Sequence, residues 1–126
     1  MRAAIIIVTM QAQNDDHPIF SLQQACELLP DVKHLTADAV RRMESLAFQL
    51  HGLAEEDPEH VSLSMALRDV VNTWAEQVQS LGLEAKGLWL VDFDNGEGYY
   101  CWSYPEPTIS HYHGYGDGFA GRLKIQ

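Results

Sequence analysis

Residues 88–104 read LWLVDFDNGEGYYCWSY and decide the fold of the C-terminal half. On both sides of Asn95-Gly96, apolar and aromatic residues recur at every second position, which is the period of a β-strand. Asn-Gly is a favoured dipeptide for a two-residue hairpin turn, because both residues tolerate positive φ. The pattern therefore predicts two antiparallel strands, Leu88–Asp94 and Glu97–Tyr104, joined by this turn.

A third strand is expected after the hairpin. Residues 104–107 (YPEP) turn the chain, and Thr108–His113 again has strand character. With a two-residue turn Trp89 lies opposite Trp102, and alternation assigns side chains to two faces. The more apolar face holds Trp89, Val91, Phe93, Tyr100, Trp102, Ile109, His111 and His113, and the other holds residues such as Asp92, Tyr99, Cys101 and Tyr112. We expect the first face to pack on helices, with Trp102 in the core.

Helical spacing dominates the chain before residue 82. Ser21 and Gln24 have the spacing of a capping box and begin a short helix that is expected to end before Pro30. Apolar residues then recur in steps of three and four over residues 31–54 and again over residues 58–81. Two helices of this length with a short connection form an antiparallel hairpin.

Together these elements predict an α+β fold, in which an antiparallel helical hairpin, with a short N-terminal helix before it, packs on a three-stranded antiparallel β-meander. The 126 residues suit one domain, which we expect over residues 19–126. Residues 1–18 are expected to form an N-terminal extension, with Met1–Thr9 as an edge strand or loose segment and residues 10–18 as a linker. The apolar start has no cleavage signal and is too short to span a membrane.

The chain is strongly acidic, with 18 Asp and Glu residues against 8 Lys and Arg residues and a net charge of −10. Such a field repels nucleic acids and anionic membranes, so neither is an expected partner. The two cysteines, Cys26 and Cys101, form no CxxC pair. Free buried cysteines are typical of cytosolic proteins, and we expect a cytoplasmic location.

Two histidines suggest a metal site. His111 and His113 lie two apart on the third predicted strand, so they point the same way with Cβ atoms roughly 6.6 Å apart. That spacing suits two imidazole ligands on one divalent ion. A third ligand would come from Asp92, Asp117 or His17. The alternative, which we favour, is that the histidines rim the aromatic face and bond to backbone groups or water.

Residues 114–122 form a glycine-rich loop that ends in Arg122. Glycines let backbone N–H groups turn toward an anion, and a guanidinium binds a carboxylate or phosphate through two hydrogen bonds. The loop could therefore receive an anion. The alternative, which we favour, is that Arg122 pairs with Asp92 or Glu106 and holds the loop to the sheet.

Cys101 is a candidate nucleophile only if a histidine lies beside it. In the predicted register, however, Cys101 and the histidines project from opposite faces of the sheet. A small buried side chain is therefore its expected role. The chain contains no complete catalytic signature such as Gly-x-Ser-x-Gly or His-Glu-x-x-His.

Several short motifs occur in a characteristic order over about residues 19–125. They are Phe20-Ser21-Leu22, Ala25, Leu28-Leu29-Pro30, Val91-Asp92-Phe93, Cys101-Trp102, Glu106-Pro107, His113 and Gly118-Phe119-Ala120-Gly121-Arg122. This series resembles the prokaryotic family catalogued as domain of unknown function 2203. The resemblance implies a cytoplasmic domain without an assigned activity and a shared polar cluster, whose candidates by motif are Asp92, Cys101, Trp102, Glu106, His113 and Arg122. Gly114 stands where the family usually has an acidic residue, which weakens a metal or proton-transfer role for His113.

Two functions are consistent with these features. The first is a non-enzymatic interaction module that forms a homodimer through its helices, because Leu35, Val40, Ala47, Leu63 and Val70 widen the apolar surface beyond one stripe. The second is a small-molecule, anion or metal-binding protein, conceivably a hydrolase, with its site at the end of the sheet that carries His111, His113 and Arg122. No cofactor is implied beyond a divalent metal for that second function.

Overall fold

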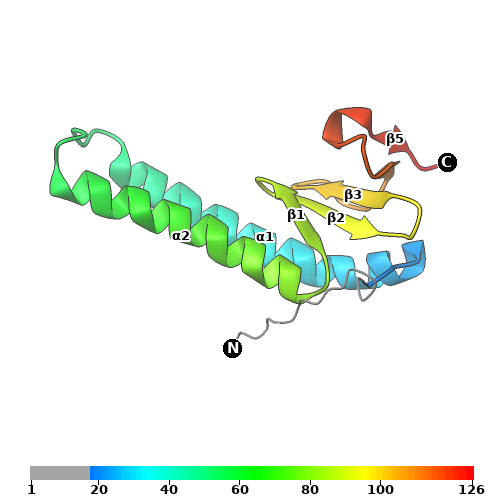
Figure 1. Ribbon diagram of the computed structural model, residues 1–126. Coiled ribbons are helices and arrows are strands. Elements are labelled where there is room, and N and C mark those ends of the chain that lie inside the picture. Colours follow the sequence, from blue (N-terminus) through cyan, green and yellow to red (C-terminus); the bar gives the residue numbers. More distant parts are fainter. Residues whose placement is uncertain (1–17) are drawn as a thin grey trace, which may run out of the picture.

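The computed structural model describes residues 18–126, so the extension predicted for residues 1–18 lies almost wholly outside the described residues. Two helices, α1 (Leu22–Leu50) and α2 (Pro58–Ser80), form an antiparallel hairpin. A five-stranded antiparallel sheet packs on one end of this hairpin (Figure 1). The predicted α+β class and helical hairpin are confirmed. Neither described helix is long and apolar enough to cross a membrane.

Helix α1 is continuous, and the predicted break at Pro30 is wrong. The helix starts as expected, because Ser21 Oγ accepts a hydrogen bond from Gln24 N at 3.1 Å and Gln24 Oε1 accepts one from Ser21 N at 2.8 Å. Pro30 has no N–H to donate within the helix. Buried Ala25, Leu29 and Val32 form one stripe across the proline, so core packing offsets the missing bond.

Helix α2 starts where the sequence indicates. Asp57 is its N-cap, and the Asp57 Oδ1 atom accepts a hydrogen bond from Glu59 N at 2.9 Å. The two helices are tied together inside the core by the indole of Trp74, which donates to Thr36 Oγ1 at 2.9 Å. That hydroxyl in turn donates to Val32 O at 2.8 Å, so every polar atom of this pair is satisfied.

The sheet has five strands rather than the predicted three. Their order is β1 (Glu84–Gly87), β2 (Leu90–Asp94), β3 (Tyr99–Ser103), β4 (His111–His113) and β5 (Leu123–Lys124). The two outer strands have four and two residues, too few to show a clear alternation. Trp89 lies in the turn between β1 and β2 with φ 59°, and its ring meets Trp74 edge-on at 5.0 Å. The predicted pairing of Trp89 with Trp102 is therefore wrong.

The hairpin of β2 and β3 is shifted by two residues from the prediction, and Val91 pairs with Trp102. The connection is a four-residue loop because side chains cap its N–H groups. Asp94 Oδ1 accepts from Gly96 N, and Asn95 Oδ1 accepts from the N–H groups of residues 97 and 98, each at 2.9 Å. A shift of two preserves the alternation, so Val91 and Trp102 are fully buried against the helices. The core position of Trp102 is confirmed.

The third predicted strand turns its histidines to the opposite face. Strand β4 pairs His111 with Cys101 and His113 with Tyr99. Both histidines therefore share the face of Cys101, and the predicted separation is wrong. Ile109 is still buried in the core, so the alternation is interrupted between Ile109 and β4. Regular pairing starts only at His111, which is why simple alternation from Ile109 assigned the wrong face.

Candidate functional site

The sheet has an inner face on the helices and an outer face turned away from them. The C-terminal segment after β4 lies over this outer face, as the orange and red ribbon in Figure 1 shows. Asp92, Cys101 and His113, from β2, β3 and β4, share the outer face with His111. Glu106, from the β3–β4 connection, and Arg122, which precedes β5, adjoin them. The outer face is thus the part of the fold where candidate residues from five segments meet.

Asp92, Cys101 and His113 form a buried cluster. Each offers one ligand-type atom, and these atoms all lie within 4.8 Å of one another. His113 Nε2 is 3.1 Å from Asp92 Oδ2, and the two side chains are only 3% and 2% exposed. The other ring nitrogen of His113, Nδ1, is 2.8 Å from the carbonyl oxygen of Gly114. Three neighbouring strands therefore hold an acid, a thiol and an imidazole in one place.

The hydrogen bonds restrict where protons lie in this cluster. A carbonyl oxygen only accepts, so His113 Nδ1 carries a hydrogen and donates to Gly114 O. The contact between His113 Nε2 and Asp92 then needs one further proton, shared by the pair. Burial raises the pKa of Asp92, and this effect outweighs the opposite influence of His113. Within the described chain, Asp92 Oδ1 is buried without a hydrogen-bond partner.

Cys101 is not an activated nucleophile. Burial, and next the charge of Asp92, raise the pKa of its thiol to about 12. A thiol with this pKa is protonated at neutral pH, and only the thiolate is a strong nucleophile. The expected small buried role fits its complete burial, although its neighbours are polar rather than apolar.

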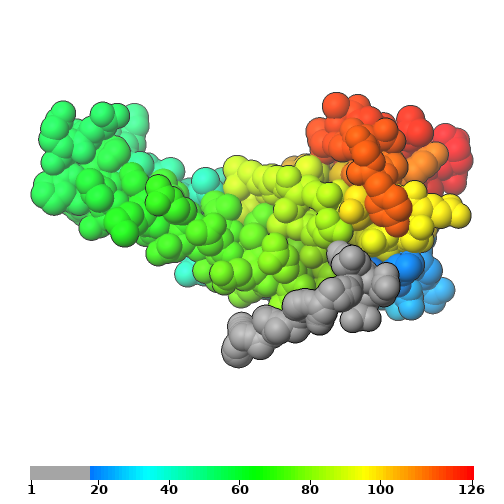
Figure 2. All heavy atoms as spheres, viewed as in Figure 1, coloured from blue at the N-terminus to red at the C-terminus, as the bar shows by residue number. Residues whose placement is uncertain are grey.

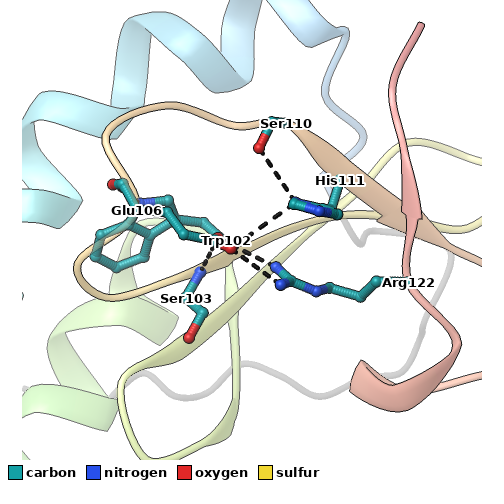
Figure 3. A network of polar contacts seen from close by, with 6 residues as sticks. All are labelled: Trp102, Ser103, Glu106, Ser110, His111 and Arg122. Atoms are coloured by element: carbon teal, nitrogen blue, oxygen red, sulfur yellow. Dashed lines mark hydrogen bonds and ion pairs between the residues drawn. The ribbon is translucent and has the colours of Figure 1, made fainter.

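Glu106 is the centre of a second cluster, drawn in Figure 3. Arg122 Nη2 lies 2.9 Å from Glu106 Oε2, and Arg122 Nη1 donates to Glu106 Oε1 at 3.1 Å. Ser103 N also donates to Oε1, at 2.8 Å. The indole of Trp102 donates to the backbone carbonyl oxygen of Glu106 at 2.8 Å. The Glu106 carboxylate is thus bound by Arg122 and by the backbone N–H of Ser103. The Glu106 backbone carbonyl is bound by the indole of the buried Trp102.

Charge stabilises this second cluster. Burial raises the pKa of Glu106, but the hydrogen bonds from Arg122 and Ser103 together with the charge of Arg122 bring it below its ordinary value. Arg122 is 14% exposed in its side chain and also lies 4.2 Å from the ring centroid of Phe119. Of the two partners anticipated for Arg122, the structure selects Glu106. The guanidinium therefore holds the C-terminal segment to the sheet.

The other metal candidates have different surroundings. His111 Nδ1 lies 3.1 Å from Ser110 Oγ and 3.8 Å from Glu106 Oε2. Asp117 is exposed, and its Oδ2 atom accepts from Gly114 N at 3.0 Å. Among the described residues, the three-ligand group around His113 contains neither of them.

Gly98 is a residue of the site that sequence reasoning missed. A Cβ atom at this position would lie 2.5 Å from the carbonyl oxygen of His113, so only glycine lets β4 approach. Gly98 directly precedes the aromatic strand β3, and a glycine at such a position often marks the close approach of another backbone. The sequence therefore contains a signal for this contact.

Comparison with known proteins supports the resemblance stated from the motifs. The model of a family described as "Uncharacterized conserved protein (DUF2203)" matches residues 18–125. Neither curated proteins nor solved structures yield a match. The matched region includes both helices, the whole sheet and every residue of the two clusters. The chain therefore belongs to the DUF2203 family of uncharacterised conserved proteins.

Proposed function

We propose that this protein is a non-enzymatic interaction module that forms a homodimer through its helical hairpin. The observation that carries the proposal is the exposed apolar surface at the distal end of the hairpin, which projects beyond the sheet (Figures 1 and 2). Phe48 is 83% exposed there, and Val61 and Met65 are 53% and 56% exposed, whereas Leu63 and Val70, which the sequence predicted at this surface, are buried within the single chain. Apolar patches of this kind on a soluble protein are typical of protein–protein contacts.

The hairpin offers enough area for a second copy. Helix α2 has 23 residues. That length corresponds to about 35 Å, and two adjacent helices are about 20 Å wide, so one free face measures about 700 Å². Two such faces bury about 1,400 Å², which is the size of an ordinary specific interface. Two hairpins packed in this way form a four-helix bundle.

Charge favours an antiparallel pairing of the two hairpins. The tip of the hairpin is acidic, with Glu55, Glu56 and Glu59, whereas Arg41 and Arg42 lie further along α1 and are exposed. A twofold axis across the hairpins brings the acidic tip of each copy toward the arginines of the other. Complementary charges of this kind set the register and raise the association rate. The same contact occurs twice, as twofold symmetry requires.

Two features of the outer face support a non-enzymatic role. Arg122 is paired with Glu106, and the Cys101 thiol is protonated at neutral pH. Hollows of about 450, 420 and 330 Å³ occur on the surface, and none is lined by Asp92, Cys101 or Arg122.

A cytoplasmic location is part of the proposal, supported by the free thiols of Cys26 and Cys101. The net charge of −10 supports a protein partner over a nucleic acid.

Light scattering coupled to size exclusion tests the proposal. We expect a dimer at micromolar concentration, with association weakened by salt because exposed charges contribute to it. Phe48→Glu places two like charges near the interface and should raise the dissociation constant by at least about tenfold. Leu88→Glu is the matched control, because Leu88 is also exposed, at 55%, but lies in the β1–β2 turn. A wild-type chain that stays monomeric at micromolar concentration, or equal effects of the two variants, would rule out this interface.

A further inference from the structure

The buried cluster of the outer face has a property that the dimer does not explain. Asp92 is 1% exposed, and within the described chain its Oδ1 atom has no hydrogen-bond partner. A buried carboxylate oxygen whose nearest donor is the weakly donating S–H group of Cys101 loses its hydration without full compensation. Its immediate polar neighbours are Cys101 and His113, with ligand-type atoms within 4.8 Å of one another. Such an atom calls for a further partner, for example an ordered water molecule or an ion.

We propose that Asp92, Cys101 and His113 together bind one divalent transition-metal ion, for which zinc is the best fit. Carboxylate oxygen, thiolate sulfur and imidazole nitrogen are the three ligand types that zinc takes in proteins. Calcium and magnesium prefer sets of oxygen ligands, which this site lacks. The proposal is independent of the helical interface, since the cluster lies on the opposite side of the sheet from the helices.

The distances need little adjustment. Two oxygen or nitrogen ligands about 2.0–2.1 Å from a tetrahedral zinc ion lie about 3.3 Å apart. His113 Nε2 and Asp92 Oδ2 are already 3.1 Å apart. The largest separation within the group is no more than 4.8 Å, so the sulfur has to move by about 1 Å to complete a triangle of ligands. Side-chain rotation accomplishes a movement of this size without displacing a strand.

The second nitrogen of His113 is held in the manner of a metal ligand. Its Nδ1 donates to Gly114 O at 2.8 Å, which leaves Nε2 toward Asp92 and Cys101. Metal-binding histidines usually donate their free N–H to a carbonyl or carboxylate, because this sets the tautomer and the ring orientation. A backbone carbonyl therefore serves here.

The charges of the site also balance. An ionised Asp92 and a Cys101 thiolate carry two negative charges, which one divalent cation neutralises. With three protein ligands on β2, β3 and β4, the ion ties three strands together and leaves one position for water.

Entry is possible through the covering segment. Residues 115–121 are exposed along their whole length, so lifting them uncovers little buried apolar surface. Three protein ligands with one open position are the coordination pattern of catalytic zinc, whereas the burial of all three side chains limits the access of a substrate to that position.

Cobalt titration of the Cys26→Ser protein gives the sharpest test. The sequence has two cysteines, so Cys101 is the sole thiol in that variant. We expect the full-length, metal-free variant to bind one Co²⁺ per chain with the intense near-ultraviolet absorption of a thiolate–cobalt bond. Zinc should displace the cobalt, and zinc should raise the melting temperature of both this variant and the wild type. Cys101→Ser should lack the absorption band and bind zinc at least about tenfold more weakly.

The outcomes separate cleanly. The proposal would be overturned if the Cys26→Ser variant showed no thiolate–cobalt band. It would also be overturned if the wild type showed a band that Cys26→Ser removes and Cys101→Ser keeps, because the band would then come from Cys26. Equal zinc affinity in wild type and Cys101→Ser would overturn it as well. If Cys101→Ser fails to fold, the Cys26→Ser spectrum decides alone, because it leaves the cluster intact. Asp92→Asn provides a further check: it should reduce zinc affinity while keeping the thiolate–cobalt band.

Discussion

Replacement of Arg122 by lysine tests whether this side chain holds the C-terminal segment to the sheet. Lysine keeps the positive charge but cannot form two parallel hydrogen bonds with one carboxylate. In the structure, two guanidinium nitrogens lie 2.9 and 3.1 Å from the two oxygens of Glu106. The substitution therefore removes at least one charge-assisted hydrogen bond and the contact of the guanidinium with the Phe119 ring.

The magnitude follows from the burial of the pair. The side chains of Arg122 and Glu106 are 14% and 22% exposed, between a surface pair and a fully buried one. Exposed pairs contribute at most about 1 kcal/mol, whereas breaking a buried pair costs about 3–5 kcal/mol. One hydrogen bond to a charged group is worth about 1.5–3 kcal/mol. We therefore expect Arg122→Lys to lower the free energy of unfolding by about 2 kcal/mol.

Urea unfolding measures this loss, with an unchanged dependence on urea indicating that the two-state transition is intact. Arg41→Lys is the matched control. Arg41 also pairs with a carboxylate, Asp38, at 3.2 Å, but the two side chains are 69% and 57% exposed. That control should change stability by less than about 0.5 kcal/mol. An equally small effect of Arg122→Lys would refute the reasoning.

The same variant distinguishes an anion site from a structural role. If the glycine-rich loop receives an anion through Arg122, phosphate or a carboxylate should raise the melting temperature of the wild type and not that of Arg122→Lys. We expect no such difference, because Glu106 already occupies the guanidinium. Strong stabilisation of the wild type alone by millimolar phosphate would make the loop a ligand site.

Three further predictions concern stability. Trp102→Ala should cost about 3–5 kcal/mol, since the indole is fully buried; a urea-measured loss below about 1 kcal/mol would contradict its place in the core. Thr36→Val should cost about 1–3 kcal/mol, because it leaves the buried Trp74 N–H without an acceptor; unchanged stability would show that the bond is dispensable. Glu106 has a lowered pKa, so its contribution is present above its unfolded pKa of about 4.5 and is lost as pH falls through the folded value. Acid titration of stability should show this loss in the wild type and a smaller one in Glu106→Gln.

The sequence by itself determined the elements whose signals are local. The Ser21 capping box, the Asp57 cap and the two apolar stripes each lie within a few turns of helix, so neighbouring residues alone specify them. The burial of Trp102 also followed from local alternation, and it survived a shift of register by two residues. A register shift by an even number of residues keeps each side chain on the same face of the sheet. The predicted core residues of the hairpin were therefore correct although the predicted turn length was wrong.

Tertiary structure decided what depends on contacts between distant segments. Helix α1 continues through Pro30 because an unbroken helix buries apolar residues on both sides of the proline in the core. The local preference of proline for a helix start does not include this tertiary contribution. Strands β1 and β5 are too short to signal themselves and form by pairing with neighbours. The backbone is irregular between Ile109 and β4, so the alternation of side chains is shifted by an odd number of residues there. His113 therefore lies on the same face as Cys101 and not on the opposite face, as the sequence predicted. Asp92, Cys101 and His113 are separated in the chain and meet only through strand register, so their cluster exists at the level of the folded sheet alone.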